Sequence, residues 1–227
     1  MRYISQNITD PGSRVWDCGS GYGTSDIFLA MNGINVNGTT IENYADLNKE
    51  RFRYWEKFGD ISLYTCSTEY FFDKLPDAES YDIILVQDTL HHLEPINQAL
   101  EIFYTTLKHK GKVVSIEQNG DCLISKLQQF RRRGNRKIIN YYDDELKKNI
   151  MMGDENFRGV KEWTGLFNEV GFFIEEKSID YIRYFLPFSY NEKNAEKLLE
   201  KELIIKKRSS LIRKYFFFGL NFMAIKR

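Results

Sequence analysis

Between Val15 and Thr24 an apolar segment ends in an aspartate and leads into three glycines at alternate positions, VWDCGSGYGT. Gly19, Gly21 and Gly23 can adopt positive φ angles and let a ligand approach the backbone closely. The apolar residues before them predict a short buried strand, and TSDIFLAMNG after them has helical periodicity. A turn at the carboxyl end of a strand that leads into a helix is where open parallel sheets bind nucleotides. The segment therefore predicts an α/β fold with a binding site at this turn.

Strand and helix patterns alternate through the rest of the first half of the chain. Further strands are predicted at 34–42, 61–67, 80–89 and 112–119, and helices at 44–59 and 96–111. The segment SYDIILVQDT contains an unbroken apolar run, which is typical of a parallel strand buried on both faces. Alternation of this length predicts a Rossmann-like, doubly wound parallel sheet with right-handed crossovers.

After Gly120 the pattern changes. Residues 121–160 show helical and partly basic character with no strand signal, which predicts a helical insertion or lid over one end of the sheet. A helix ending at Gly171, a long strand at 173–187, a helix at 192–215 and a terminal strand at 216–227 follow. We therefore expect one domain, 1–227, with a core at 13–120, the insertion at 121–160 and a C-terminal core part at 161–227.

Charge and cysteine content narrow the function classes. The chain has 32 Lys and Arg residues against 32 Asp and Glu residues, so no global field attracts nucleic acid or an anionic membrane. Its 3 cysteines are far apart and form no zinc-binding spacing, which favours a reducing, cytoplasmic location. No signal-peptide pattern and no membrane-spanning apolar run are visible.

Two acidic residues indicate which nucleoside the turn binds. Glu42 ends the second predicted strand, where a carboxylate can accept both ribose hydroxyls. The dinucleotide pattern GxGxxG would require a glycine in place of Thr24. Asp17, directly before the loop, would repel a pyrophosphate but suits a cationic ligand. S-adenosylmethionine carries a sulfonium and an ammonium group and no phosphate, so the electrostatics favour it over NAD.

The motifs DCGSGYG with Glu42, and then YDIILVQDTLHHLEP, resemble the class I S-adenosylmethionine-dependent methyltransferases over about 13–118. The resemblance implies a seven-stranded sheet whose last, antiparallel strand is inserted beside strand five, a place that 216–227 can fill. It also implies that Asp17 lies near the methionine ammonium group and that Glu42 holds the ribose. The backbone of Gly19 and Gly21 would line the methionine, and the loop that ends at Gly23 would lie under the adenosine.

The same resemblance implies further cofactor contacts. In this family, an acidic residue that follows strand three often accepts a hydrogen bond from the adenine amino group. The corresponding segment here is CSTEYF, so Ser67, Thr68 or Glu69 is expected to make this contact. Gln87, at the end of strand four, either faces the methionine end or caps the following turn. Only a short segment precedes the first strand, which predicts an open cofactor pocket or one completed by a second subunit in a homodimer.

Methyl transfer from a sulfonium is an in-line displacement, in which the protein mainly aligns the reactants. An oxygen nucleophile also benefits from a base. His91 is the first candidate for this base and Glu117 the second, although the histidines of HHLEP can instead pack and cap the turn. The motif that accompanies methylation of adenine or glutamine amino groups is replaced by QDTL, which disfavours these acceptors. The sequence predicts no metal ligands.

Acceptor specificity is expected in 122–158 and 191–215. The segment FRRRGNRK, residues 130–137, can bind a phosphate, contact RNA or form a solvated helix face. The helix EKELIIKKRSSLIRKY can dock on an anionic membrane or pack on the sheet. We predict methyl transfer to a small molecule, on the oxygen of a sugar or lipid-linked intermediate, with no role for DNA. The alternatives are an RNA or protein methyltransferase, or a non-catalytic relative that binds the cofactor.

Overall fold

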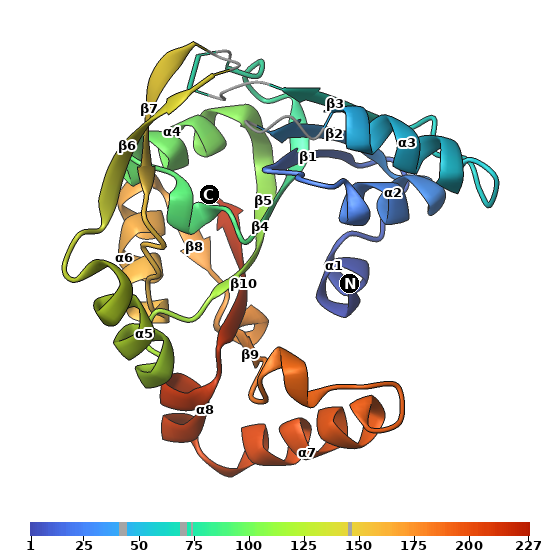
Figure 1. The fold of residues 1–227 in the computed structure, drawn as a ribbon. Coiled ribbons are helices and arrows are strands. Elements are labelled where there is room, and N and C mark those ends of the chain that lie inside the picture. Colours follow the sequence, from blue (N-terminus) through green and yellow to red (C-terminus); the bar gives the residue numbers. More distant parts are fainter. Residues whose placement is uncertain (41–44, 69–71, 74, 145–146) are drawn as a thin grey trace.

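The computed structural model describes residues 1–40, 45–68, 72–73, 75–144 and 147–227. Its main sheet contains the strands β1 (Arg14–Cys18), β2 (Asn35–Thr40), β3 (Tyr64–Thr68), β4 (Tyr81–Gln87), β5 (Leu107–Gln118), β8 (Phe172–Ile174), β9 (Asp180–Ile182) and β10 (Gly219–Lys226). The strand order is β3-β2-β1-β4-β5-β10-β8, and β9 also pairs with β10 (Figure 1). All pairs from β3 to β5 are parallel, whereas β10 is antiparallel to β5. This confirms the predicted sheet, including the antiparallel last strand beside strand five.

Helices cover both faces of this sheet (Figure 1). One face carries α1 (Arg2–Asn7), α2 (Thr24–Met31) and α3 (Ala45–Trp55), and the other carries α4 (Ile96–Thr106) and α6 (Val160–Val170). Neighbouring residues of β1 point to opposite faces: Val15 joins the core beneath α1 and α2, and Trp16 joins the core beneath α4 and α6. The apolar run in β4 is buried on both faces, as predicted, because each face meets a helical layer.

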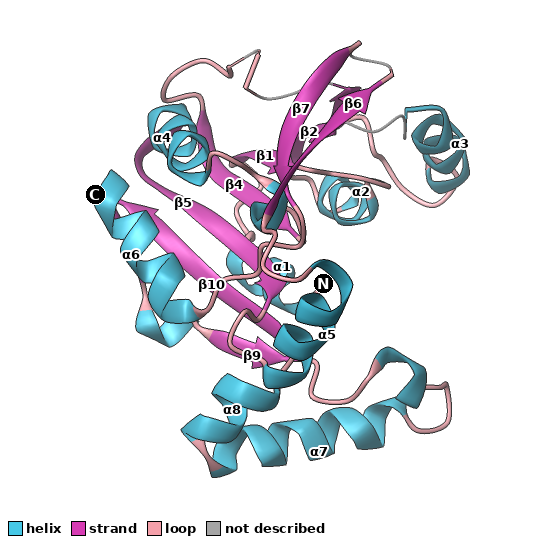
Figure 2. Cartoon of the chain, turned by 60° about the vertical axis from the view of Figure 1, so that its left-hand side comes forward, coloured by secondary structure: helices cyan, strands magenta, loops and turns pink. Residues whose placement is uncertain are grey.

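The insertion after β5 differs from the expectation. It begins with the helix α5 (Leu123–Arg133), but a hairpin of β6 (Ile138–Asp143) and β7 (Lys148–Gly153) follows. The prediction of a helical insertion without strands is therefore wrong for 138–153. The β6 sequence IINYYD places like residues side by side, so it lacks the alternation of apolar and polar residues that identifies a strand with one buried face. Figure 2 shows the hairpin rising beside the carboxyl end of β4.

Two predictions for the C-terminal part are also wrong. The long strand expected at 173–187 is divided into β8, a short 3₁₀ turn at Glu176–Ser178 and β9. The expected helix at 192–215 consists of α7 (Ala195–Arg208) and α8 (Ser210–Phe216). The sheet packing weighed for this helix is not found, because α7 extends away from the sheet and exposes Leu199, Leu203 and Ile204 (Figure 2). Among the described residues, no helix has the length and apolar character needed to cross a membrane.

Candidate functional site

The glycine loop joins β1 to α2 and has the conformation that the sequence predicted. Gly19, Gly21 and Gly23 have φ angles of +92°, +50° and +64°. A Cβ on Gly19 would lie 2.3 Å from Thr89 Oγ1, and one on Gly23 would lie 2.7 Å from the Tyr64 hydroxyl, whereas one on Gly21 would meet no atom of the described residues within 4 Å. Gly19 and Gly23 therefore allow close packing of the loop, and Gly21 leaves open space above it.

A pair of buried carboxyl groups lies beneath this loop. Asp17 lies in β1, directly before its last residue, and is 2% exposed, and Asp26, in the first turn of α2, is 0% exposed. Burial raises the pKa of Asp17 to about 6, and the neighbouring Asp26 carboxyl group offsets part of the increase. Burial and the charge of Asp17 raise the pKa of Asp26 well above its usual value. At neutral pH, which is above its pKa of about 6, Asp17 is mostly ionised.

The Asp17 carboxylate is not fully satisfied. Its Oδ1 atom, like both carboxyl oxygens of Asp26, is buried and has no hydrogen-bond partner among the described residues. Because a buried anion without a partner is costly, this atom fits a cationic ligand group such as an ammonium. The sequence analysis missed Asp26, since an acid in the first turn of a helix is usually explained by the helix dipole.

Other predicted cofactor residues lie around the same edge of the sheet. Gln87 ends β4, and its Oε1 accepts a hydrogen bond from Ser25 Oγ, in α2, at 2.8 Å. Ser67, in β3, lines a separate cavity of about 330 Å³ together with Thr39 and Cys66. Thr68 is the last residue of β3, and its side chain is not described. The predictions for Glu42 and Glu69 lie outside the described residues.

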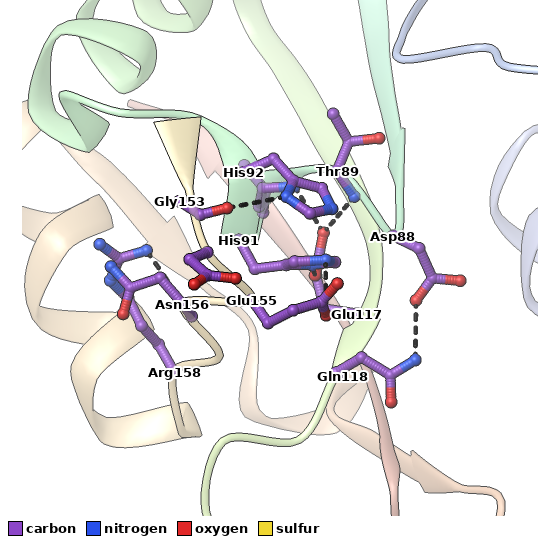
Figure 3. A network of polar contacts seen from close by, with 12 residues as sticks. Asp88, Thr89, His91, His92, Glu117, Gln118, Gly153, Glu155, Asn156 and Arg158 are labelled. Atoms are coloured by element: carbon purple, nitrogen blue, oxygen red, sulfur yellow. Dashed lines mark hydrogen bonds and ion pairs between the residues drawn. The ribbon is translucent and has the colours of Figure 1, made fainter. Parts of the chain in front are cut away.

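His91 and Glu117, the two predicted bases, are brought together in a buried ion pair (Figure 3). His91 lies in the 3₁₀ turn Leu90–His92 and Glu117 near the end of β5, and they are 3% and 1% exposed. His91 Nδ1 lies 2.5 Å from Glu117 Oε2. Burial lowers the pKa of His91, but the charge and hydrogen bond of Glu117 outweigh it, so that the pKa is raised.

Glu117 also organises the turn around His91. Its Oε1 atom accepts hydrogen bonds from the backbone N–H groups of Thr89 at 2.9 Å and Leu90 at 2.7 Å. Neither His91 nor Glu117 lines the large cleft described below. These contacts favour a positioning role for the pair, and a base role for either residue stays a prediction.

Glu117→Ala is expected to lower the free energy of unfolding by about 3 kcal/mol or more, because it leaves two N–H groups and His91 without an acceptor in the protein interior. Glu117→Gln keeps an amide oxygen for the N–H groups and should lose less. The difference in the free energy of unfolding between wild type and Glu117→Gln should be largest below about pH 6.5. It should disappear as the pH rises through the raised pKa of His91. Urea unfolding across this pH range measures both effects, and an Ala variant as stable as wild type would contradict the placement.

A second cluster holds the insertion against this turn. Glu94 Oε1 accepts hydrogen bonds from Arg158 Nη2 at 2.6 Å and Asn156 Nδ2 at 2.7 Å, and all three residues are buried. The arginine also lies over the Trp163 ring, 5.1 Å from its centre. Sequence reasoning missed this cluster, because its members lie far apart along the chain. It fixes the segment after β7 beside His91 and His92.

A large cleft opens beside the carboxyl ends of β4 and β5. Its volume is about 1230 Å³, and its walls come from α1, α5, α7 and the segment 177–190. Gln87 and Gln118 line this cleft. The hydrogen bond between Gln87 and Ser25 connects the cleft to α2, the helix that follows the glycine loop. The cleft is larger than the ~300–1,000 Å³ typical of small-molecule sites, so it can hold a sizeable ligand.

Comparisons with known proteins agree with this geometry. Residues 16–115 match the family model of the methyltransferase domain. A histidine protein methyltransferase 1 homolog from Dictyostelium discoideum is 28% identical over 179 residues, which cover 74% of this chain and 55% of the relative. The chain thus spans little more than half the length of this curated relative.

Two solved structures share the fold. A SAM-dependent methyltransferase from Methanosarcina mazei has a TM-score of 0.64 at 17% identity, with 98% of this chain and 96% of that chain covered. Phosphoethanolamine N-methyltransferase 2 from Haemonchus contortus, in complex with S-adenosyl-L-methionine, has a TM-score of 0.65 at 16% identity, with 99% of this chain and 51% of that chain covered.

The described residues fit the cofactor of these proteins. The unpartnered oxygen of Asp17 suits an ammonium group, and the open space at Gly21 admits a ligand against the backbone. The matching domain model, the sheet order and this loop agree. Residues 16–115 match the methyltransferase-domain model, the chain shares its fold with S-adenosylmethionine-dependent methyltransferases, and S-adenosylmethionine is the cofactor that this site fits.

Proposed function

We propose that this protein transfers the methyl group of S-adenosylmethionine to a small-molecule acceptor that enters the cleft between α1 and α7. The observation that carries the proposal is the buried, unpartnered Asp17 oxygen beneath a glycine loop, and Gln87, which lines the cleft, is hydrogen-bonded to Ser25 in the helix that follows this loop. The cofactor supplies an activated methyl group. The protein's part is then to bind, to align and to exclude water.

Each residue has a distinct part in this proposal. Asp17 binds the ammonium group of the cofactor, and Gly21 lets the ligand approach the loop. Gln87, held by Ser25, aligns the methionine end. The His91–Glu117 pair keeps the turn after β4 in place, and this turn carries Thr89, which packs on Gly19.

The cleft lining supports an amphipathic acceptor with an anionic group. Apolar and aromatic side chains contribute from several elements, among them Tyr3, Phe157, Phe185, Tyr190, Leu199 and Leu203. Cationic side chains also line the cleft: Arg2, and Lys177, Arg183 and Lys206, which pair with Glu175, Asp88 and Asp180. A sugar phosphate or lipid-linked intermediate has this combination of apolar and anionic groups, and methylation on oxygen is the reaction that we propose. Peripheral membrane contact and a homodimer, both considered from the sequence, stay predictions.

The basic segment 130–137 gives less support to RNA binding. Asp154 pairs with Arg132 at 2.6 Å and with Arg136 at 2.9 Å. Arg133 Nη2 donates a hydrogen bond to the backbone oxygen of Glu155 at 3.3 Å. Three of the arginines therefore connect α5 and the start of the hairpin to the end of β7, which favours a role in holding the insertion.

A protein histidine is the second candidate acceptor, because the Dictyostelium discoideum relative is named as a histidine protein methyltransferase. Incubation of a cell extract with the protein and methyl-labelled S-adenosylmethionine, followed by separation into small-molecule, lipid, RNA and protein fractions, distinguishes the candidates. We expect label in the small-molecule or lipid fraction, and none with Asp17→Asn. Label confined to protein would support the second candidate, and equal label with the variant would contradict both.

A further inference from the structure

Two adjacent histidines are held in defined tautomers where the insertion meets the turn after β4. His92 Nδ1 lies 2.9 Å from the backbone oxygen of Gly153, and His91 Nδ1 lies 2.5 Å from Glu117 Oε2. Both partners are acceptors, so each Nδ1 must carry the hydrogen. The Nε2 atom of each ring is then free to act as an acceptor or as a metal ligand.

A third side chain converges on the two rings. Glu155 Oε2 lies 3.7 Å from His91 Nε2, and Figure 3 shows Glu155 beside the histidine rings. His91, His92 and Glu155 each offer one ligand atom, and these atoms all lie within 4.8 Å of one another. Zn²⁺ is bound by histidine and carboxylate ligands at about 2.0–2.2 Å, so two ligand atoms of one ion lie at most about 4.4 Å apart. The separation between His91 and Glu155 fits as it stands, and the 4.8 Å limit for the three atoms requires at most a small side-chain rotation.

The backbone fixes Glu155 in this position. Its φ angle is +53°, which is unusual for a residue with a side chain. On one side, a Cβ on Gly153 would lie 2.0 Å from the His91 carbonyl oxygen, so only glycine permits this approach of β7. On the other side, Asn156 N donates to the same oxygen at 3.3 Å, and its side chain binds Glu94. The segment after β7 is therefore anchored on both sides of Glu155.

The supporting contacts match those of metal-binding histidines. Such histidines almost always donate their second ring N–H to a carboxylate or a backbone carbonyl, which fixes the ring and its tautomer. Here Glu117 supplies the carboxylate and Gly153 the carbonyl. The Glu155 side chain is 30% exposed and that of His91 only 4%, so an ion can enter from the Glu155 side.

We propose that His91, His92 and Glu155 bind one divalent transition-metal ion, Zn²⁺ in the first instance. Two imidazoles and one carboxylate leave a fourth position open for water or a ligand, as in catalytic zinc sites. Phe157 packs against the His91 ring, with ring centres 4.9 Å apart, and also lines the large cleft. The ion would therefore lie next to the cleft. The sequence predicted no metal, because Glu155 belongs to the insertion and its approach depends on the fold.

A Zn²⁺ titration of the full chain, after removal of metals with a chelator, tests this site. We expect one ion per chain by calorimetry. Co²⁺ in place of Zn²⁺ should give the visible absorption of a four-coordinate site. Glu155→Gln and His92→Asn should each weaken binding by about tenfold or more. The Gln variant keeps the size of the side chain, and the Asn variant keeps a donor for Gly153, so both should fold.

The matched controls are the remaining histidine and a second glutamate. His109→Ala removes the third of the 3 histidines, and Glu169→Ala removes an exposed acid from α6; neither should change Zn²⁺ affinity. Cys66→Ser should likewise have no effect, which excludes a thiolate site. Wild type without saturable binding, or a Glu155→Gln/His92→Asn double variant that binds as tightly as wild type, would overturn the proposal. The readout does not involve S-adenosylmethionine, so it is independent of the proposed function.

Discussion

Asp17→Asn is expected to weaken S-adenosylmethionine binding by about a hundredfold and at the same time to stabilise the ligand-free protein. The affinity falls because the variant removes the buried anion that faces the ammonium group. The stability rises by about 2 kcal/mol at pH 7, because the folded wild type must keep a buried carboxylate ionised although its pKa is raised to about 6. Calorimetry with the cofactor and urea unfolding measure the two effects.

The Asp17 carboxyl group also makes the stability of the protein depend on pH. The pKa of Asp17 is higher in the folded chain, about 6, than the usual aspartate value of 3.8, so the folded state binds more protons between these values. The free energy of unfolding of wild type should therefore decrease from about pH 4 to about pH 6, and this component should be absent in Asp17→Asn.

Asp26→Asn is the matched control. It keeps the Asp17 carboxylate and gives it an amide donor instead of a second acid, so cofactor affinity should be kept or increased. An Asp17→Asn variant with wild-type affinity would show that this carboxylate does not face the cofactor.

Gly19→Ala is expected to destabilise the protein by about 3 kcal/mol and to abolish cofactor binding. At φ +92° the new Cβ would lie 2.3 Å from Thr89 Oγ1, so the loop and the turn after β4 would have to separate. Gly21→Ala is the comparison. Gly21 has a φ of +50°, and an added Cβ would meet no atom of the described residues within 4 Å. We therefore expect this variant to lower the free energy of unfolding by only about 1 kcal/mol.

The two glycine variants separate folding from binding. Gly21→Ala should fold almost normally but bind the cofactor poorly, because its methyl group occupies the space where the ligand approaches the loop. Denaturant unfolding and calorimetry on both proteins provide the test. A Gly19→Ala variant as stable as wild type would contradict the close packing on Thr89, and full affinity in Gly21→Ala would contradict the position of the ligand.

The parts of the fold that the sequence predicted are those with strong local patterns. The apolar run of β4 and the three glycines before α2 depend on burial and on φ angles, which nearby residues determine. The hairpin of β6 and β7 was missed because the β6 sequence lacks the alternation of apolar and polar residues that identifies a strand with one buried face. The helical character of α7 was recognisable, but its position away from the sheet depends on tertiary contacts.

The candidate site was predictable to a similar extent. Asp17 and the glycine loop follow from a contiguous motif, and His91 with Glu117 from the ends of two strands. The contact between Asp17 and Asp26 is a consequence of how α2 packs on β1. Glu155 reaches the histidines only because the insertion folds back over the turn after β4, and nothing in its own segment indicates this.

Titration of the wild-type protein with S-adenosylmethionine and, separately, with NAD⁺ tests the central claim most directly. The Asp17 carboxylate beneath the glycine loop predicts saturable binding of the cationic sulfonium nucleoside and no binding of the pyrophosphate. Saturable binding of NAD⁺, with no response to S-adenosylmethionine, would contradict the account.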